Sequence, residues 1–154
     1  MDDAAMLIMP IRECEGAQSE MIERMWKQWG NPSNYDFYEY AIKNSVDALE
    51  IPHLFCGCIN GKLIGFGALI RTELGSRQDL TPWLTALYIK EAFRNMGFGK
   101  QLQLYAMQQA KQMGYPALYL STGLNGYYER TGWGFVENGI EADGSLHRIY
   151  RIPL

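Results

Sequence analysis

The stretch from residue 84 to residue 102 constrains the fold of this chain more than any other part of the sequence. It starts with an apolar run over 84–89, whose composition is typical of a strand buried on both faces. A short turn with Arg94, Gly97 and Gly99 follows, and beyond it apolar residues recur at three- and four-residue spacing as far as Met113. The segment is therefore predicted to be a strand, a glycine-rich turn and a helix.

This turn has the ingredients of an anion-binding site, because bare backbone N–H groups, a helix N-terminus and Arg94 would surround one small volume. A Walker loop does not fit, since Lys100 is followed by Gln101 instead of Ser or Thr. A dinucleotide-binding loop requires a third glycine where Leu102 stands. A turn that only caps the helix remains the alternative, but the preceding strand and Arg94 favour an anion site.

The residues of this turn resemble the acetyl-CoA signature of the GNAT superfamily of N-acyltransferases, Gln/Arg-x-x-Gly-x-Gly/Ala, which matches residues 94–99. A second segment, GYYERTGW at 126–133, is similar to the aromatic-Tyr-Glu-Lys/Arg-x-Gly-aromatic segment of the same family. The two segments have the family's order and about its usual separation. The resemblance covers residues 62–135 and extends more loosely to the N-terminal third.

The resemblance implies an α/β (α+β) fold, a single GNAT-type domain over residues 1–154. Its mixed, mostly antiparallel central sheet would have six to seven strands, with helices on both faces. It also implies an acetyl-CoA-dependent N-acetyltransferase. Such an enzyme moves an acetyl group to a primary amine of a small molecule or peptide, by direct attack within a ternary complex.

The resemblance further assigns residues to the acetyl donor. Backbone amides after Arg94 would hold the pyrophosphate, and main-chain groups of the preceding strand would bind the pantetheine arm. The residues assigned to acetyl-CoA are Leu87, Tyr88, Ile89, Arg94, Asn95, Met96, Gly97, Phe98, Gly99, Lys100 and Asn125. A backbone N–H of Leu87 or Ile89 would stabilise the oxyanion that forms on the thioester carbonyl.

The family motif makes Tyr128 the acid that protonates the departing thiolate, while Tyr127 is expected to pack in the core. Asp79, Trp83 and Tyr38 are expected to contact the acceptor substrate. The general base is left open among Asp79, Glu73, Glu39 and a water relay. His53 and His147 are interpreted as structural.

The bulk properties bound the class of protein. A chain of 154 residues fits one domain, and its net charge of −3 without a basic block disfavours nucleic acid as a partner. No apolar run approaches the roughly 20 residues that cross a membrane. The acidic N-terminus lacks the features of a signal peptide, so a cytoplasmic protein is expected. The protein is expected to be a monomer or a homodimer.

The three cysteines, Cys14, Cys56 and Cys58, are expected to be small buried hydrophobes in a reducing compartment. No second Cys/His pair stands at zinc spacing, so no metal is expected.

The remaining elements follow from periodicity and turn signals. Asn60-Gly61 is the strongest hairpin signal in the chain, and Gly65 and Gly67 in the return strand are expected to permit close backbone approach. Strands are predicted over 6–11, 53–59, 62–71, 117–121, 134–137 and 147–152. Helices are predicted over 19–29 with Ser19 as N-cap, over 35–49 with Val46 among its apolar positions, and briefly around 127–132.

Two other classes of function remain compatible with the sequence. The chain could be a CoA- or acyl-CoA-binding sensor without catalysis, which the lack of an evident base supports. Alternatively, it could be a protein-interaction domain whose glycine turn binds no ligand.

Overall fold

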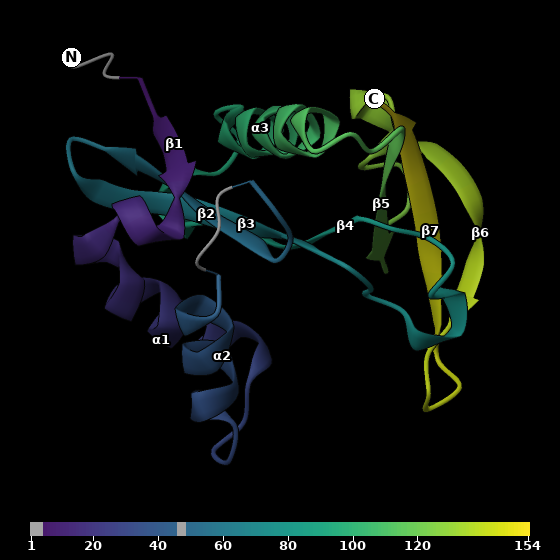
Figure 1. Ribbon diagram of the computed structural model, residues 1–154, viewed down its shortest axis with the longest axis horizontal. Coiled ribbons are helices and arrows are strands. Elements are labelled where there is room, and N and C mark those ends of the chain that lie inside the picture. Colours follow the sequence, from purple (N-terminus) through teal and green to yellow (C-terminus); the bar gives the residue numbers. More distant parts are fainter. Residues whose placement is uncertain (1–4, 46–48) are drawn as a thin grey trace.

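A computed structural model describes residues 5–45 and 49–154, which form one seven-stranded mixed sheet in the order β1-β2-β3-β4-β5-β7-β6. The strands are β1 (Leu7–Pro10), β2 (His53–Ile59), β3 (Lys62–Ile70), β4 (Trp83–Ile89), β5 (Ala117–Thr122), β6 (Gly134–Ile140) and β7 (Leu146–Pro153). Only β4 and β5 pair in parallel. Helix α3 (Phe98–Gln112) covers one face, and α1 (Gln18–Trp29) and α2 (Tyr35–Lys43) cover the other (Figure 1). The predicted fold class is confirmed.

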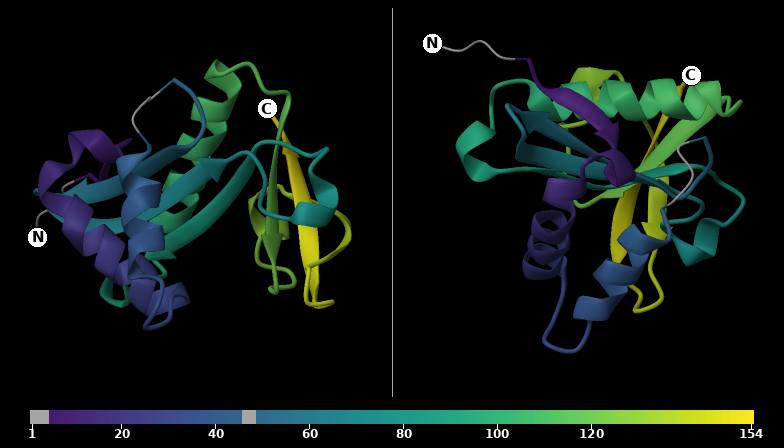
Figure 2. Two further views of the ribbon diagram at one scale, coloured as in Figure 1. Left: turned by 60° about the horizontal axis from the view of Figure 1, so that its bottom comes forward. Right: turned by 60° about the vertical axis from the view of Figure 1, so that its left-hand side comes forward.

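The sheet is split between β4 and β5. These strands pair at one position, Trp83 opposite Tyr119, and then diverge, so the two halves of the sheet open away from each other (Figure 2). The β5-facing backbone edge of β4 therefore has no partner strand beyond Trp83. The second half of β4 is only half-buried, which corrects the prediction of a strand buried on both faces. The reason is that this part of β4 borders the opening in the sheet.

A β-bulge in β4 contributes to the divergence. Phe66 lies opposite Tyr88 and Ala68 lies opposite Thr85, so two residues of β4 face the single Gly67 of β3. Ala86, inside the bulge, has φ +54°, a left-handed conformation that is uncommon for a residue with a side chain. A bulge bends its strand and increases the local twist.

Helix α3 holds the two halves together on the closed face of the sheet. Its residues Leu102, Ala106 and Ala110 are fully buried in one cluster with Phe55 of β2 and Tyr150 of β7. The tight packing beneath it requires small residues. A Cβ at Gly65 would lie 2.5 Å from the Tyr88 carbonyl oxygen, and one at Gly67 would lie 2.7 Å from the Phe55 ring. Close backbone approach is thus confirmed at Gly65, whereas at Gly67 the close neighbour is a side chain.

Several element boundaries differ from the predictions. The predicted hairpin at Asn60-Gly61 is confirmed, and both residues are left-handed, Asn60 with φ +51° and Gly61 with φ +77°. Ser19 is not a cap, because α1 begins at Gln18, and α2 ends at Lys43 instead of Leu49. The prediction for Val46 falls outside the described residues. The predicted helix at 127–132 is reduced to the single turn of η5 (Glu129–Thr131).

The cysteines are buried as predicted, but two of them are not free thiols. Cys14 and Cys56 form a disulfide, and the Cys58 thiol lies within 4.8 Å of their sulfurs. This corrects the prediction of three reduced cysteines. Cys14 precedes α1 by a short 3₁₀ turn and is 42 residues from Cys56 in sequence, so only the packing of this segment on β2 brings the two together.

Candidate active site

Two cavities occupy the open face where β4 and β5 diverge. The wedge cavity, of about 840 Å³, lies between the sheet and helices α1 and α2. The loop groove, of about 480 Å³, follows the end of β4 to the turn before α3. The two share part of their lining, namely Gln28, Trp29, Leu87, Leu124 and Tyr128. They therefore meet beside the β4 edge that lacks a partner strand.

The two cavities carry opposite charge. The charged side chains that line the loop groove, among the described residues, are Arg94, Lys100 and Arg130. In the wedge cavity the only described charged residue is Glu73. The loop groove is thus suited to an anionic ligand, and the wedge cavity to a ligand with one positive charge.

Backbone conformation prepares the loop groove for an anion. Asn95 (φ +63°) and Gly97 (φ +83°) are left-handed, and Gly97 precedes the first residue of α3. No described side chain caps this helix, so its first N–H groups remain available. Arg94 is fixed beside them, since its Nε donates a 2.9 Å hydrogen bond to the Ile89 carbonyl and its guanidinium lies 5.5 Å from the centre of the Tyr88 ring.

The loop that carries Tyr128 is held from two sides. On one side, Gln103 of α3, 2% exposed, accepts hydrogen bonds from the Thr131 hydroxyl and the Trp133 indole N–H, both of 3.0 Å. On the other side, the Tyr150 hydroxyl donates a 2.5 Å hydrogen bond to Glu129. This support fixes the backbone on which Tyr128 stands.

Tyr128 lines both cavities, and its ring packs against Trp133 and Tyr150. Burial raises the pKa of Tyr128 to about 12, so its hydroxyl stays protonated at neutral pH. Tyr127 differs from the prediction of a core residue. It is 46% exposed, and its hydroxyl would lie 3.5 Å from a Cβ at Gly99, which places it over the loop groove.

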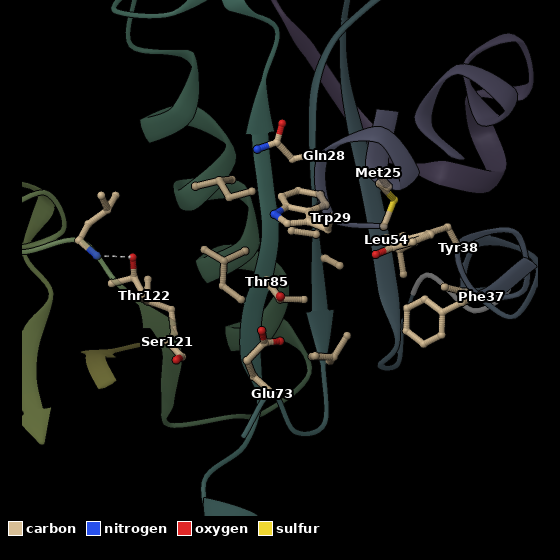
Figure 3. Close-up of a pocket in the computed structure, with 18 of the residues that line it drawn as sticks. Met25, Gln28, Trp29, Phe37, Tyr38, Leu54, Glu73, Thr85, Ser121 and Thr122 are labelled. Atoms are coloured by element: carbon tan, nitrogen blue, oxygen red, sulfur yellow. Dashed lines mark hydrogen bonds between the residues drawn. The ribbon is translucent and has the colours of Figure 1, made fainter. Parts of the chain in front are cut away.

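Glu73 points into the wedge cavity close to Thr85 of β4 (Figure 3). Glu73 is exposed to solvent, yet neighbouring protein atoms partly desolvate its carboxylate. This desolvation raises the pKa of Glu73, and nearby Glu141 raises it further. A hydrogen bond with Thr85 and the proximity of His147 act in the opposite direction.

The structure brings together most of the residues that the sequence assigned to acetyl-CoA. Leu87, Tyr88, Ile89, Arg94, Asn95, Gly97, Phe98, Gly99 and Lys100 all line the loop groove. Of the residues assigned to the acceptor, Tyr38 lines the wedge cavity. The Met96 side chain is 61% exposed and lines neither cavity, which leaves only its backbone N–H for a ligand.

Three predicted site residues lie elsewhere. Asp79 is exposed and pairs with Arg77 at 2.9 Å. Trp83 is fully buried, and its indole N–H donates to the Leu80 carbonyl at 2.6 Å. Asn125 is exposed and lines neither cavity. We therefore do not assign these three residues to the site.

The candidate general bases also differ in whether they face a cavity. Glu39 forms an ion pair with Lys43 on α2 and lines neither cavity, so Glu73 is the one member of the predicted set that faces a cavity. His53 is buried, and its Nε2 lies 3.0 Å from the Tyr105 hydroxyl, in keeping with a structural role.

Other cavity residues carry no signal in the sequence. Gln28 and Trp29 end α1, and no motif marks either of them as a cavity residue. Gln103 interrupts the apolar pattern of α3 without any feature that marks it as the anchor of a loop 28 residues away.

Helix α3, with 15 residues, is the longest helix described, and none of the described helices could cross a membrane.

Comparisons with known proteins agree with this geometry. Residues 18–133 match the acetyltransferase (GNAT) family. An uncharacterized N-acetyltransferase of Escherichia coli (strain K12), YjgM, is 39% identical over 62 residues, which make up 40% of this chain and 36% of that protein. The match thus spans little more than a third of the relative's length.

Solved structures resemble the whole chain. An aminoglycoside 6'-N-acetyltransferase complexed with coenzyme A has a TM-score of 0.74 at 15% identity, over 96% of this chain and 97% of that one. A GNAT family acetyltransferase from Brucella melitensis in complex with acetyl-CoA has a TM-score of 0.63 at 17% identity, over 98% and 89%. At such low identity these likenesses establish the fold alone. The family match over residues 18–133 shows that this chain belongs to the GNAT family of acetyltransferases.

Proposed function

We propose that this enzyme transfers the acetyl group of acetyl-CoA to a primary amine of a small molecule or peptide, with both substrates bound at once. The observation that carries the proposal is the shared lining of the two cavities. A donor in the loop groove and an acceptor in the wedge cavity would meet beside Leu87 and Tyr128. Both substrates could then occupy the enzyme at the same time.

The chemistry of the loop groove fits acetyl-CoA. Its three cations and the uncapped N-terminus of α3 suit a pyrophosphate, since such anion–helix contacts contribute roughly 0.3–2 kcal/mol each. The Tyr127 hydroxyl lies over Gly99, 3.5 Å from where a Cβ would stand, so a larger side chain at this position would enter the groove. The free edge of β4 offers main-chain groups to the amides of the pantetheine arm.

Acetyl-CoA supplies a thioester carbonyl, and the residues of this chain would handle the charges that develop around it. Leu87 lines both cavities, so its backbone N–H is our choice for the oxyanion donor. In the overall reaction an ammonium ion loses a proton, the C–N bond forms and the C–S bond breaks. The thiolate then takes up a proton, so that an amide, free CoA thiol and one proton result.

The proposed role of Tyr128 is to donate its hydroxyl hydrogen to the departing thiolate. With a pKa of about 12, against about 8.5 for a thiol, complete transfer is uphill by roughly 3–4 pKa units, or about 4–5 kcal/mol. We therefore propose that Tyr128 mainly stabilises the thiolate by hydrogen bonding. The proton released by the amine can then complete the protonation of the sulfur.

A turnover assay tests the proposal. The purified full chain would be incubated with acetyl-CoA and a panel of primary amines, and free thiol release would be followed together with the mass of the acetylated product. We expect amine-dependent release and one added acetyl group per acceptor. Acetyl-CoA binding without acetylation of any amine would instead support the non-catalytic CoA sensor.

A further inference from the structure

The part of the wedge cavity that faces α1 and α2 is lined mainly by apolar side chains. Toward α1 and α2 it is bounded by Met25, Phe37, Tyr38 and Leu54, which Figure 3 shows on one side of the cavity. Ile70 of β3 adds a further aliphatic surface. The volume of about 840 Å³ would accommodate an aromatic ring with its linker as well as the acetyl end of the donor.

Glu73 lies at the border of this apolar region. Its carboxylate is next to Thr85, two residues before Leu87 on β4, so it lies on the same stretch of strand as the proposed oxyanion donor. An ammonium group hydrogen-bonded to Glu73 would thus reach the thioester carbonyl directly or through one water. The groups that face Glu73 are Thr85 from β4 and, from the β6–β7 hairpin, Glu141 and His147. Among the described residues of the wedge cavity, neither lysine nor arginine competes for it.

We infer that the acceptor is a monoamine with a single positive charge and an apolar body of arylalkyl size, with its ammonium on Glu73 and its body against Met25, Phe37 and Tyr38. The inference rests on the proposed function and specifies its substrate class. It also makes Glu73 the group that receives the amine and accepts its proton before attack.

The same lining disfavours the other common amine classes. A polycation would place its second and third ammonium groups against apolar side chains, where a charge without a partner is strongly destabilised. A free amino acid would bring its carboxylate close to Glu73, and like charges at short range repel. Both classes should therefore bind at least tenfold more weakly than a monoamine with a similar body.

Calorimetric titration of the full chain, saturated with CoA, measures acceptor affinity without turnover. Three probes represent the three amine classes. Phenethylamine is the monoamine, phenylalanine adds a carboxylate to the same body, and spermidine is a polycation. We expect phenethylamine to bind at least tenfold more tightly than either of the others. Equal or tighter binding of phenylalanine or spermidine, or no binding of any probe, would overturn the inference.

A variant tests the role of Glu73. Glu73→Gln should weaken phenethylamine binding at least tenfold and leave CoA affinity within about twofold, because Gln keeps the shape and loses the charge. Glu23→Gln is the matched control, since Glu23 pairs with the exposed Lys27 and lines neither cavity. Unchanged phenethylamine binding in Glu73→Gln would overturn the assignment of the ammonium site.

Thiol release, measured in parallel, distinguishes this inference from the proposed function. Selective binding of phenethylamine without thiol release would support the substrate class and contradict acetyl transfer. Thiol release with spermidine but not with phenethylamine would support acetyl transfer and overturn the substrate class.

Discussion

The two cavities give Tyr128 and Glu73 different surroundings, and these surroundings determine the protonation of each side chain. Tyr128 stands where the cavities meet, with its hydroxyl kept protonated by burial, whereas its neighbour Tyr127 reaches only the loop groove. Glu73 lines the wedge cavity and is exposed to solvent, and partial desolvation by the surrounding protein raises its pKa. These environments lead to two predictions for single residues.

Tyr128→Phe should lower kcat about 10- to 150-fold, since it removes a hydrogen bond to a forming thiolate worth roughly 1.5–3 kcal/mol. The KM for acetyl-CoA should change much less, and the ring contacts with Trp133 and Tyr150 should preserve the fold. Steady-state kinetics and a thermal melt measure both effects. Tyr127→Phe is the control with the same chemical change, and full activity in Tyr128→Phe would remove Tyr128 from the mechanism.

Glu73→Gln should make the unliganded protein more stable relative to wild type as the pH rises from about 4 to 7. Because burial raises the pKa of Glu73, the native state binds this proton more tightly than the unfolded chain, so stability is lost above the ordinary carboxyl pKa of about 4.3. Gln does not titrate and escapes this loss. Solvent access to Glu73 limits the expected gain in Tm to a few degrees, and a gain that shrinks with rising pH would contradict the argument.

At the scale of elements, the turn before α3 and the segment before α1 carry the most specific features. The turn combines two left-handed residues with an uncapped helix, which exposes N–H groups in one direction. The segment before α1 is joined to β2 by the Cys14–Cys56 disulfide, and α1 in turn carries Gln28 and Trp29 to both cavities. Each feature predicts the effect of a local change.

Gly99→Glu should weaken acetyl-CoA binding at least about 100-fold, because the new side chain would enter the loop groove and repel a diphosphate. Met96→Glu adds the same charge on a side chain that points away from the groove, so only a screened effect of a few-fold is expected. Calorimetry with acetyl-CoA compares the two variants. Similar affinity losses in both would show that charge alone, and not the position of Gly99, controls binding.

Reduction of the disulfide should lower Tm. For a separation of 42 residues, chain entropy gives a stabilisation of at most about 4 kcal/mol, which corresponds to roughly 8–15 °C for a domain of this size. Thermal melts with and without reductant measure the shift. Cys14→Ser should melt at one temperature under both conditions, while Cys58→Ser should keep the dependence on reductant. Identical melts of the unmodified protein would show that the bridge does not form in solution.

At the scale of the whole molecule, the split sheet is held closed on one face and left open on the other. Helix α3 packs on residues from both halves of the sheet, and a second buried cluster of Leu74, Trp83 and Ile149 joins the halves near the start of β4. A ligand in the loop groove would contact the end of β4, the start of α3 and the loop that carries Tyr128. It would therefore add a link between the two halves of the sheet beside the end of β4, where the strands have diverged.

Acetyl-CoA at 100 times its Kd should accordingly raise Tm by about 5–10 °C, since binding at that excess stabilises the native state by about 2.7 kcal/mol. Differential scanning fluorimetry with acetyl-CoA, and with acetate as a control for the acyl group alone, measures this effect. An unchanged Tm at high excess would favour the protein-interaction domain over any CoA-binding function.

The sequence by itself determined the local elements and the family to which they point. Short stretches of sequence predict the strand, glycine turn and helix at 84–112, the Asn60-Gly61 hairpin and the two family segments. They can do so because periodicity and turn geometry depend on residues a few positions apart. The same short range explains why Arg94, Gly97 and Gly99, which belong to one turn, line one groove.

Only the tertiary structure decided which distant side chains share a cavity. Asp79 and Glu73 are both acidic residues of one loop, yet Asp79 turns to Arg77 and Glu73 to the wedge cavity. Gln103 supports a loop 28 residues away, and Cys14 meets Cys56 across 42 residues. Such contacts follow from the divergence of β4 and β5 and the packing of helices on the sheet, which depend on interactions between segments that no local pattern encodes.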